Sequence, residues 1–352
     1  MKYLRQFGRL LAATQLLPVL ENGEETTLVG GQAVLEGVMM RSPHAWGIAV
    51  RKGSGEVVTH SEPLERKSDK HNWMRWPILR GVMTLAAAMA LGFRALKFSA
   101  NVALEDLAGN ENSEKPAGTA HHDIHIPSWL IAINALISVG FFIFMYKFLP
   151  LVATTALRRV NPIFGHQVLF NLIDGLIRIA LFLLFIWAIS LFSDIRRLYQ
   201  YHGAEHKTVF CFEAGDPLTE REAQKFVTFH PRCGTSFLMT VLLISIVVYM
   251  AIPLGTSAAP ANDFRHLFDH LFWMRFALRI ALLPVIAGVS YEIIRYAARK
   301  RSSLFALMTQ PGLWLQRITT KEPADDQVQC AIAALNDAME LEKTHGGELV
   351  IA

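Results

Sequence analysis

Two histidines and a glutamate stand close together in the stretch His202-Gly203-Ala204-Glu205-His206. On a continuous helix, residues four apart lie on the same face, so His202 and His206 would present both imidazoles to one point. Two imidazoles so placed can bind one divalent metal ion, and Glu205 beside them can act as a general base. The order H-x-x-E-H is that of the inverted zinc-hydrolase motif. The alternative is a polar helix end whose histidines face water or lipid phosphates.

A zinc site needs a third protein ligand, and the stretch His230-Pro231-Arg232-Cys233-Gly234 offers two. The Cys233 thiolate is a soft ligand and the His230 imidazole a borderline one, and both suit zinc. Arg232 between them is a further candidate site residue. The alternative is a tight turn built on Pro231 and Gly234, with Cys233 as a small buried side chain.

Ionisable residues inside apolar stretches supply the remaining candidates. Glu292 lies late in such a stretch, and an ionisable residue in a membrane helix is a functional hypothesis by default. Glu292 could be the third metal ligand, although an ion pair with Arg178 or Arg279, or snorkelling to the interface, is the favoured interpretation. Asp174 and Arg178 are four residues apart on one predicted helix, so we expect them to pair with each other.

The elements that must position these residues are mostly membrane helices. Hydrophobic residues make up 52% of the 352-residue chain and charged residues 18%, against about 25% charged residues in soluble domains. A spanning helix needs about 20 apolar residues, and four segments qualify: Ser128–Phe148, Leu169–Phe192, Thr235–Leu254 and Phe276–Ala298. A shorter apolar run between Arg80 and Arg94 predicts instead an amphipathic helix that lies at the membrane interface.

Basic residues in the loops orient the predicted bundle. Residues 194–234 contain six Lys and Arg residues, whereas residues 255–272 contain only Arg265. Four spans then place the basic loop and both termini on the cytoplasmic side. All three cysteines would lie in a reducing compartment and remain thiols. The implied partner is the lipid bilayer, because positive charge gathers beside the apolar runs and does not form a nucleic-acid footprint.

The chain divides into six segments along these lines. Residues 1–27 are an amphipathic N-terminal segment, and residues 28–75 are a small strand-containing cytoplasmic region. Residues 76–107 form the interfacial helix, and residues 108–127 form a polar linker. Residues 128–298 form the four-span bundle with its cytoplasmic loop 194–234, and residues 299–352 form a cytoplasmic amphipathic tail.

Two of the soluble segments have clear local signals. In the N-terminal region, Trp46–Lys52 and Glu56–His60 flank Gly53-Ser54-Gly55, which predicts a β-hairpin. In the C-terminal tail, Asp325–Lys343 has the apolar period of a helix. The predicted fold is therefore mainly α: a polytopic membrane bundle of about four spans, with a small α+β cytoplasmic N-terminal region and a C-terminal cytoplasmic helix.

The chain resembles a bacterial family of uncharacterised membrane proteins, domain-of-unknown-function family 1385 (DUF1385). The resemblance runs from about Gly30 to the C-terminal helix and is carried by Gly30–Arg41, Tyr201–His206, His230–Ser236, and Pro311–Gln316 with Thr319 and Thr320. The family is commonly described as predicted metal-dependent enzymes, so the resemblance implies a metal site, in a bacterial plasma membrane.

The resemblance also draws attention to Glu36 and Arg41 in the first of these stretches. The paired glycines that precede them permit unusual backbone angles. Glu36 and Arg41 could face the metal site or a polar substrate. A strand and turn that packs onto the bundle is the favoured alternative.

The first functional hypothesis is a membrane-embedded metallohydrolase that works at the cytoplasmic interface. Zinc would be held by His202, His206 and one of Cys233, His230 or Glu292. Glu205 would activate the water, whose pKa falls to about 7 on the metal.

Two other functions compete with it. In a non-enzymatic membrane scaffold or assembly factor, the metal would staple the basic loop to the bundle, and an unknown protein partner would dock on the N-terminal region or the C-terminal helix. A transporter rests only on the charged residues within spans, and no internal repeat supports it.

Overall fold

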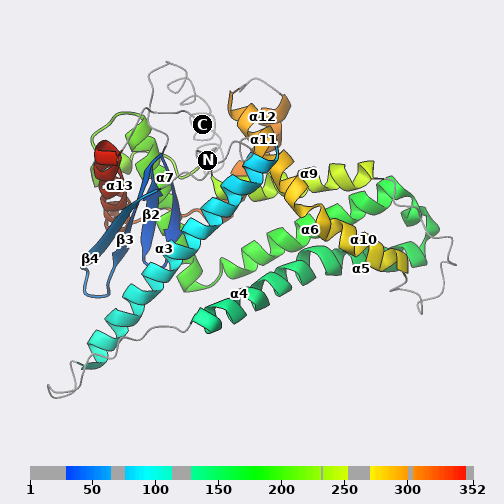
Figure 1. The fold of residues 1–352 in the computed structure, drawn as a ribbon, viewed down its shortest axis with the longest axis horizontal. Coiled ribbons are helices and arrows are strands. Elements are labelled where there is room, and N and C mark those ends of the chain that lie inside the picture. Colours follow the sequence, from blue (N-terminus) through cyan, green and yellow to red (C-terminus); the bar gives the residue numbers. More distant parts are fainter. Residues whose placement is uncertain are drawn as a thin grey trace, which may run out of the picture.

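The computed structural model describes residues 29–64, 76–112, 128–230, 233–252, 270–299 and 304–345. A small antiparallel sheet and its covering helices lie at one end of the molecule (Figure 1). The helices α4 (Ser128–Ile143), α6 (Gln167–Ile189) and α10 (His270–Ala281) extend toward the opposite end. The predicted mainly helical fold with a small N-terminal sheet is therefore confirmed.

The sheet has four strands in the order β1-β2-β3-β4: Gly30–Val34, Gly37–Arg41, Ala45–Arg51 and Val57–Pro63. The predicted hairpin at Gly53-Ser54-Gly55 joins β3 to β4. Its turn is closed by hydrogen bonds from the Gly55 N–H to the Lys52 carbonyl (2.9 Å) and from the Lys52 N–H to the Glu56 carbonyl (2.9 Å). Gly55 has a φ of +90°, a conformation that glycine adopts without strain.

Helices cover both faces of this sheet. On one face, Val38, Met40 and Ala49 pack against α7 (Ser193–Glu213) and α13 (Asp325–His345). Neighbouring residues on the same strands point to the other face, where Met39 and Ile48 pack against α3 (Leu79–Asn112). Because both faces are covered, the central strands are apolar at nearly every position and do not alternate. We call the four strands with α7, α8 (Glu220–Ala223) and α13 the sheet unit.

The 34-residue helix α3 links the sheet unit to the bundle (Figure 1). The sequence predicted an interfacial helix here, because the apolar run between Arg80 and Arg94 is short. The helix is uninterrupted, and its residues Leu79–Asp106 are long and apolar enough to cross a membrane. Its side chains Leu91, Ala95 and Val102 pack on the sheet, and its first turns pack on α11 (Leu283–Arg299).

The bundle consists of α4, the π-helical turn η3 (Phe144–Phe148), α5 (Leu149–Val160), the 3₁₀ turn η4 (Pro162–Gly165), α6, α9 (Gly234–Ala251), α10, α11 and α12 (Leu304–Thr319). Among the described residues, four helices are long and apolar enough to cross a membrane, counting α3. The bent pair α10 and α11 would make a fifth.

Two predicted spans differ from what the sequence suggested. The first does not end at Phe148, because Pro150 sits in the first turn of α5, where a missing N–H is tolerated. The last, predicted as one helix over Phe276–Ala298, is broken between Ala281 and Leu283 and bent by 45°. Pro284 starts the second piece, as proline often does.

Candidate metal centre

The helix α7 is continuous through the H-x-x-E-H motif, as predicted. His202 and His206 therefore share one face, with their ring centroids 4.5 Å apart. Gly203 between them allows a close approach: a Cβ there would lie 2.0 Å from the Lys321 carbonyl oxygen. The same segment is held by a hydrogen bond from the Lys321 N–H to the Tyr199 carbonyl (2.9 Å). The glycine thus brings the chain after α12 next to the two imidazoles.

Backbone carbonyls orient both imidazoles. Nδ1 of His202 lies 2.8 Å from the Thr319 carbonyl oxygen, and Nδ1 of His206 lies 2.5 Å from that of Thr228. Because a carbonyl only accepts, each Nδ1 must donate, which leaves each Nε2 to face the site. The Nε2 of His206 is buried and has no hydrogen-bond partner among the described residues. Its lone pair is therefore available to a metal ion.

Cys233, which is the N-cap residue of α9, completes the group. Its Sγ lies 3.2 Å from the Nε2 of His202 and 3.1 Å from the Thr235 hydroxyl. The ligand atoms of His202, His206 and Cys233 all lie within 4.8 Å of one another. Two imidazoles and one thiolate suit zinc, and three protein ligands leave a fourth position open, as in catalytic zinc sites. The donor set therefore fits zinc.

Glu205 lies beside this group. Its Oε2 is 3.6 Å from the Nε2 of His206 and 3.9 Å from that of His202. Gly31 on β1 makes room for it, because a Cβ on Gly31 would lie 2.7 Å from the Glu205 Cγ and 2.7 Å from the Met39 carbonyl oxygen. Within the described part of the chain, the glycines with positive φ are Gly55 and Gly215. Gly31 is therefore needed for space and not for an unusual backbone angle.

The charges of the site favour a thiolate. Burial raises the pKa of the Cys233 thiol, but the neighbouring His202 and His206 imidazoles outweigh it and hold that pKa well below its usual value. Burial lowers the pKa of His202, but the Cys233 thiolate and the Glu205 carboxylate raise it to about 9. Without a metal, Cys233 and His202 therefore form a thiolate–imidazolium pair. A metal ion that binds this pair displaces a proton.

His230, the other ligand that the sequence left open, lies beside the group. Its ring centroid is 5.5 Å from that of His206 and 4.7 Å from that of Phe210, and its Nε2 is 3.9 Å from a Glu213 carboxylate oxygen. Burial and the charge of His206 lower the pKa of His230 to about 4, so this ring is neutral near pH 7. Cys233 is the candidate whose ligand atom joins the two histidines.

Gln316 fixes the turn that carries Cys233. Its side-chain amide accepts from the His230 N–H (2.7 Å) and donates to the His230 carbonyl (2.8 Å) and to the Ser236 hydroxyl (2.8 Å). Gly312 lets α12 approach α9, since a Cβ there would lie 2.6 Å from the Ser236 Cα. No sequence motif indicates this role for Gln316. The only signal for it in the sequence is its place in a stretch that carries the family resemblance.

The structure places Glu292 in an ion pair away from the His/Cys group. The Arg80 Nε donates to the Glu292 Oε1 (2.6 Å), and a second guanidinium nitrogen contacts Oε2. The favoured interpretation, an ion pair, therefore holds, but its partner is on α3 and is neither Arg178 nor Arg279. The predicted Asp174–Arg178 pair is present, with 2.5 Å between Asp174 Oδ2 and Arg178 Nη2.

The remaining candidates lie at the edge of the sheet unit or outside the described residues. Glu36, in the turn between β1 and β2, accepts hydrogen bonds from the Arg197 Nε (2.5 Å) and the Tyr201 hydroxyl (3.3 Å). It ties this turn to α7. Arg41 is exposed at the end of β2. Arg232 lies outside the described residues.

Comparisons with known proteins agree with the resemblance. The family model described as "Protein of unknown function (DUF1385)" matches residues 76–341. The "Uncharacterized protein YqhQ" of Bacillus subtilis (strain 168) is 31% identical over 318 residues, which cover 89% of this chain and 92% of that protein. No solved structure matches the chain. The family match includes the three residues of the His/Cys group, Glu205 and Gln316.

Proposed function

The chain belongs to the DUF1385 family, and we propose that it is a zinc-dependent hydrolase at the cytoplasmic face of a bacterial plasma membrane. The observation that carries the proposal is the convergence of His202 Nε2, His206 Nε2 and Cys233 Sγ beside a buried carboxylate. Zinc held there would act as a Lewis acid and lower the pKa of a bound water to about 7.

The residues of the chain then have distinct roles. His202, His206 and Cys233 hold the ion, and the Thr319 and Thr228 carbonyls keep the two imidazoles in the required tautomer. Glu205, within 4 Å of both Nε2 atoms, takes a proton from the attacking water and returns it to the leaving group. Hydrolysis needs both functions at one point, and these side chains supply them.

The position of the centre favours a substrate at the membrane surface. Cys233 directly precedes α9, and α7 begins four residues after α6 ends. Both α6 and α9 are long and apolar enough to span. The centre therefore lies near the end of one candidate span and the start of another, which supports a place at the membrane surface, and the basic loop 194–234 favours the cytoplasmic side.

Metal analysis of the purified protein tests the site. We expect about one zinc per chain, because three ligands of suitable type converge. In His206→Ala, zinc content should fall below about a tenth, since the ion loses one of its three protein ligands. His166→Ala, at an exposed position in the bundle, is the matched control and should keep full content. Metal-free wild-type protein from zinc-replete cells would overturn the proposal.

A structural zinc is the second candidate, because the group is deeply buried, with His206 only 1% exposed and Cys233 9% exposed. Glu205 would then be the fourth ligand of a closed site. Glu205→Gln separates the two. If Glu205 is a general base, the variant should keep its zinc and lose hydrolysis of a panel of peptides and esters. If Glu205 is a fourth ligand, the variant should lose zinc itself.

A further inference from the structure

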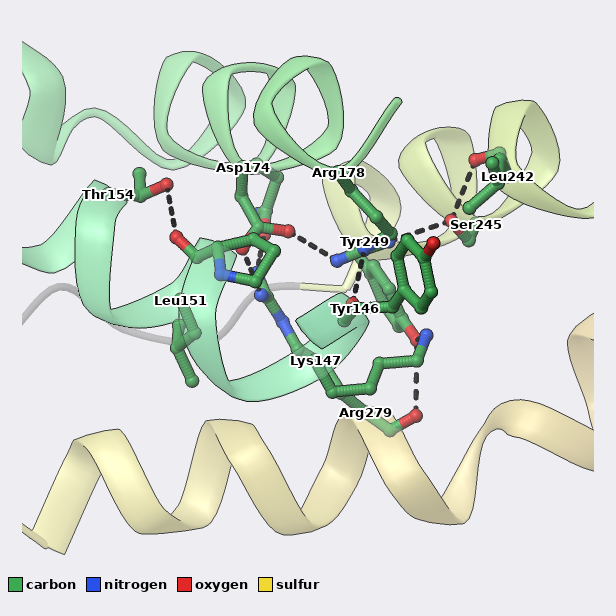
Figure 2. A network of polar contacts seen from close by, with 12 residues as sticks. Tyr146, Lys147, Leu151, Thr154, Asp174, Arg178, Leu242, Ser245, Tyr249 and Arg279 are labelled. Carbon is green, nitrogen blue, oxygen red and sulfur yellow. Dashed lines mark hydrogen bonds and ion pairs between the residues drawn. The ribbon is translucent and has the colours of Figure 1, made fainter. Parts of the chain in front are cut away.

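A second group of buried polar residues lies in the bundle, and we call it the bundle cluster (Figure 2). It consists of Lys147 on η3, Asp174 and Arg178 on α6, Tyr249 on α9 and Arg279 on α10. Each is less than a tenth exposed. None of them belongs to the metal centre, and the proposed hydrolase uses none of them.

Asp174 is the single carboxylate of the cluster, and two arginines already share it. Arg178 Nη2 lies 2.5 Å from Oδ2, and Arg279 Nη1 lies 2.5 Å from Oδ1. Figure 2 shows Asp174 between the two guanidinium groups. One negative charge therefore faces two positive charges, and the cluster is cationic before Lys147 is counted.

Lys147 adds a third basic group with few partners. Its Nζ has three N–H donors, and the described residues offer it one acceptor, the Tyr249 hydroxyl at 3.2 Å. The Tyr249 ring also faces all three cations, with centroid distances of 5.1 to 5.4 Å. An aromatic face compensates a buried cation only in part. A net positive charge at this depth is costly unless an anion accompanies it.

The π-helical turn η3 and the break between α10 and α11 both lie at this cluster. Pro150 has no N–H, so the carbonyl four residues earlier, that of Tyr146, loses its helical donor. Arg178 Nε donates to this carbonyl instead (2.9 Å). Near the break between α10 and α11, the Arg279 carbonyl accepts from the Tyr249 hydroxyl (3.1 Å). Interrupted helices that converge on buried charges are how helical membrane proteins commonly build ion and substrate sites.

We propose that the bundle cluster binds one small monovalent anion at the Lys147 ammonium. The positive surplus selects an anion. Arg178 already donates to Asp174, Ser245 and the Tyr146 carbonyl. The free donors of the cluster are therefore mainly those of Lys147. A single ammonium suits a monatomic or small planar anion of the halide or nitrate class better than phosphate, which needs several donors.

Anion dependence of the full chain in non-ionic detergent tests this. At pH 7 and constant ionic strength, replacement of sodium gluconate by sodium chloride should raise the unfolding temperature saturably, by about 2–4 °C. Bromide, which sheds water more readily, should act at lower concentration than fluoride. The ³⁵Cl NMR signal should broaden on addition of protein, which reports binding directly.

Lys147→Met should remove both responses. Because it removes a buried basic group from a cluster that already has a positive surplus, it should be at least as stable as the wild type in gluconate. Lys147→Arg keeps the charge and should keep the chloride response, and Lys225→Met, at an exposed site, should not change it. A wild type that is insensitive to chloride in both measurements, or a response that survives Lys147→Met, would overturn the proposal.

Discussion

The metal centre and the bundle cluster bury charged groups to a similar depth but offer opposite chemistry. In the candidate metal centre, carbonyls take the Nδ1–H donors of both imidazoles, and the atoms that a metal ion would meet are two Nε2 nitrogens, a sulfur and a nearby carboxylate. In the bundle cluster, two arginines contact the one carboxylate, and N–H donors of Lys147 remain without an acceptor among the described residues. Excess acceptors suit a cation and excess donors suit an anion.

The difference teaches that a buried group must be judged by what its neighbours leave unpaired. Both centres contain a carboxylate close to two cationic or cation-forming side chains. The two centres differ only in where the other hydrogen-bond donors and acceptors lie. Three measurements test that distinction.

Asp174→Asn should have the largest effect on stability. It leaves two guanidinium groups buried without a counter-charge, a loss that costs about 3–5 kcal/mol of unfolding free energy. Denaturant unfolding in mixed micelles measures it. Asp194→Asn, at an exposed position on α7, is the control and should change stability by less than about 0.5 kcal/mol. A cost below about 1 kcal/mol for Asp174→Asn would mean that the cluster does not depend on its carboxylate.

Gly31→Ala should perturb the metal centre and leave the bundle unchanged. The added Cβ meets both the Glu205 Cγ and a strand carbonyl at 2.7 Å, so we expect a loss of about 1–3 kcal/mol and displacement of Glu205. Gly30→Ala is a close control, because nothing lies within 4 Å of the Cβ it would add. Unfolding and hydrolysis assays on the pair separate steric displacement from general strand effects. Equal behaviour of the two variants would show that Glu205 does not need this space.

The smallest effect concerns the reactivity of Cys233 in metal-stripped protein. Between pH 8.5 and 6.5 an ordinary thiol, with a pKa of about 8.5, loses about fiftyfold of its thiolate. The pKa of Cys233 is held well below the usual value by His202 and His206, so its alkylation by iodoacetamide should fall far less. The thiolate is lost only as the pH falls through this lowered pKa.

The two other cysteines serve as internal references for that experiment. Burial raises the pKa of Cys211 to about 11, and burial also raises the pKa of Cys330. Neither should be modified at pH 6.5, as mass spectrometry of peptides can show. Cys233→Ser identifies the reactive site, and added zinc should protect it. Modification of Cys233 with an ordinary pH profile would contradict the thiolate–imidazolium pair.

Short-range spacing was enough to predict that His202 and His206 share one face of a helix in the candidate metal centre. The four-residue interval between His202 and His206 needs only a continuous helix, and α7 is continuous there. Cys233 could be proposed as a ligand because it directly precedes an apolar run, which places it at the same membrane face as the two histidines. The β3–β4 hairpin followed in the same way from its glycines.

Contacts between distant segments could not be predicted. The partner of Glu292 is Arg80, 212 residues away, and no periodicity indicates such a pair. Gln316 reaches His230 across 86 residues. The prediction that α3 lies at the interface has the same origin. Apolar side chains on one face of α3 pack on the sheet, and composition alone does not distinguish a protein surface from lipid.

The position of α13 has a consequence for biosynthesis. The strands of residues 30–63 leave the ribosome first, yet the helix that covers one face of their sheet is residues 325–345. At about 5–20 residues per second, that face lacks its α13 cover for tens of seconds. The carbonyl that orients His202 belongs to Thr319, so the metal centre is completed equally late. A chain that stops before Thr319 would therefore have all three ligand residues but lack the carbonyl that orients His202 and the helix α13 over its sheet.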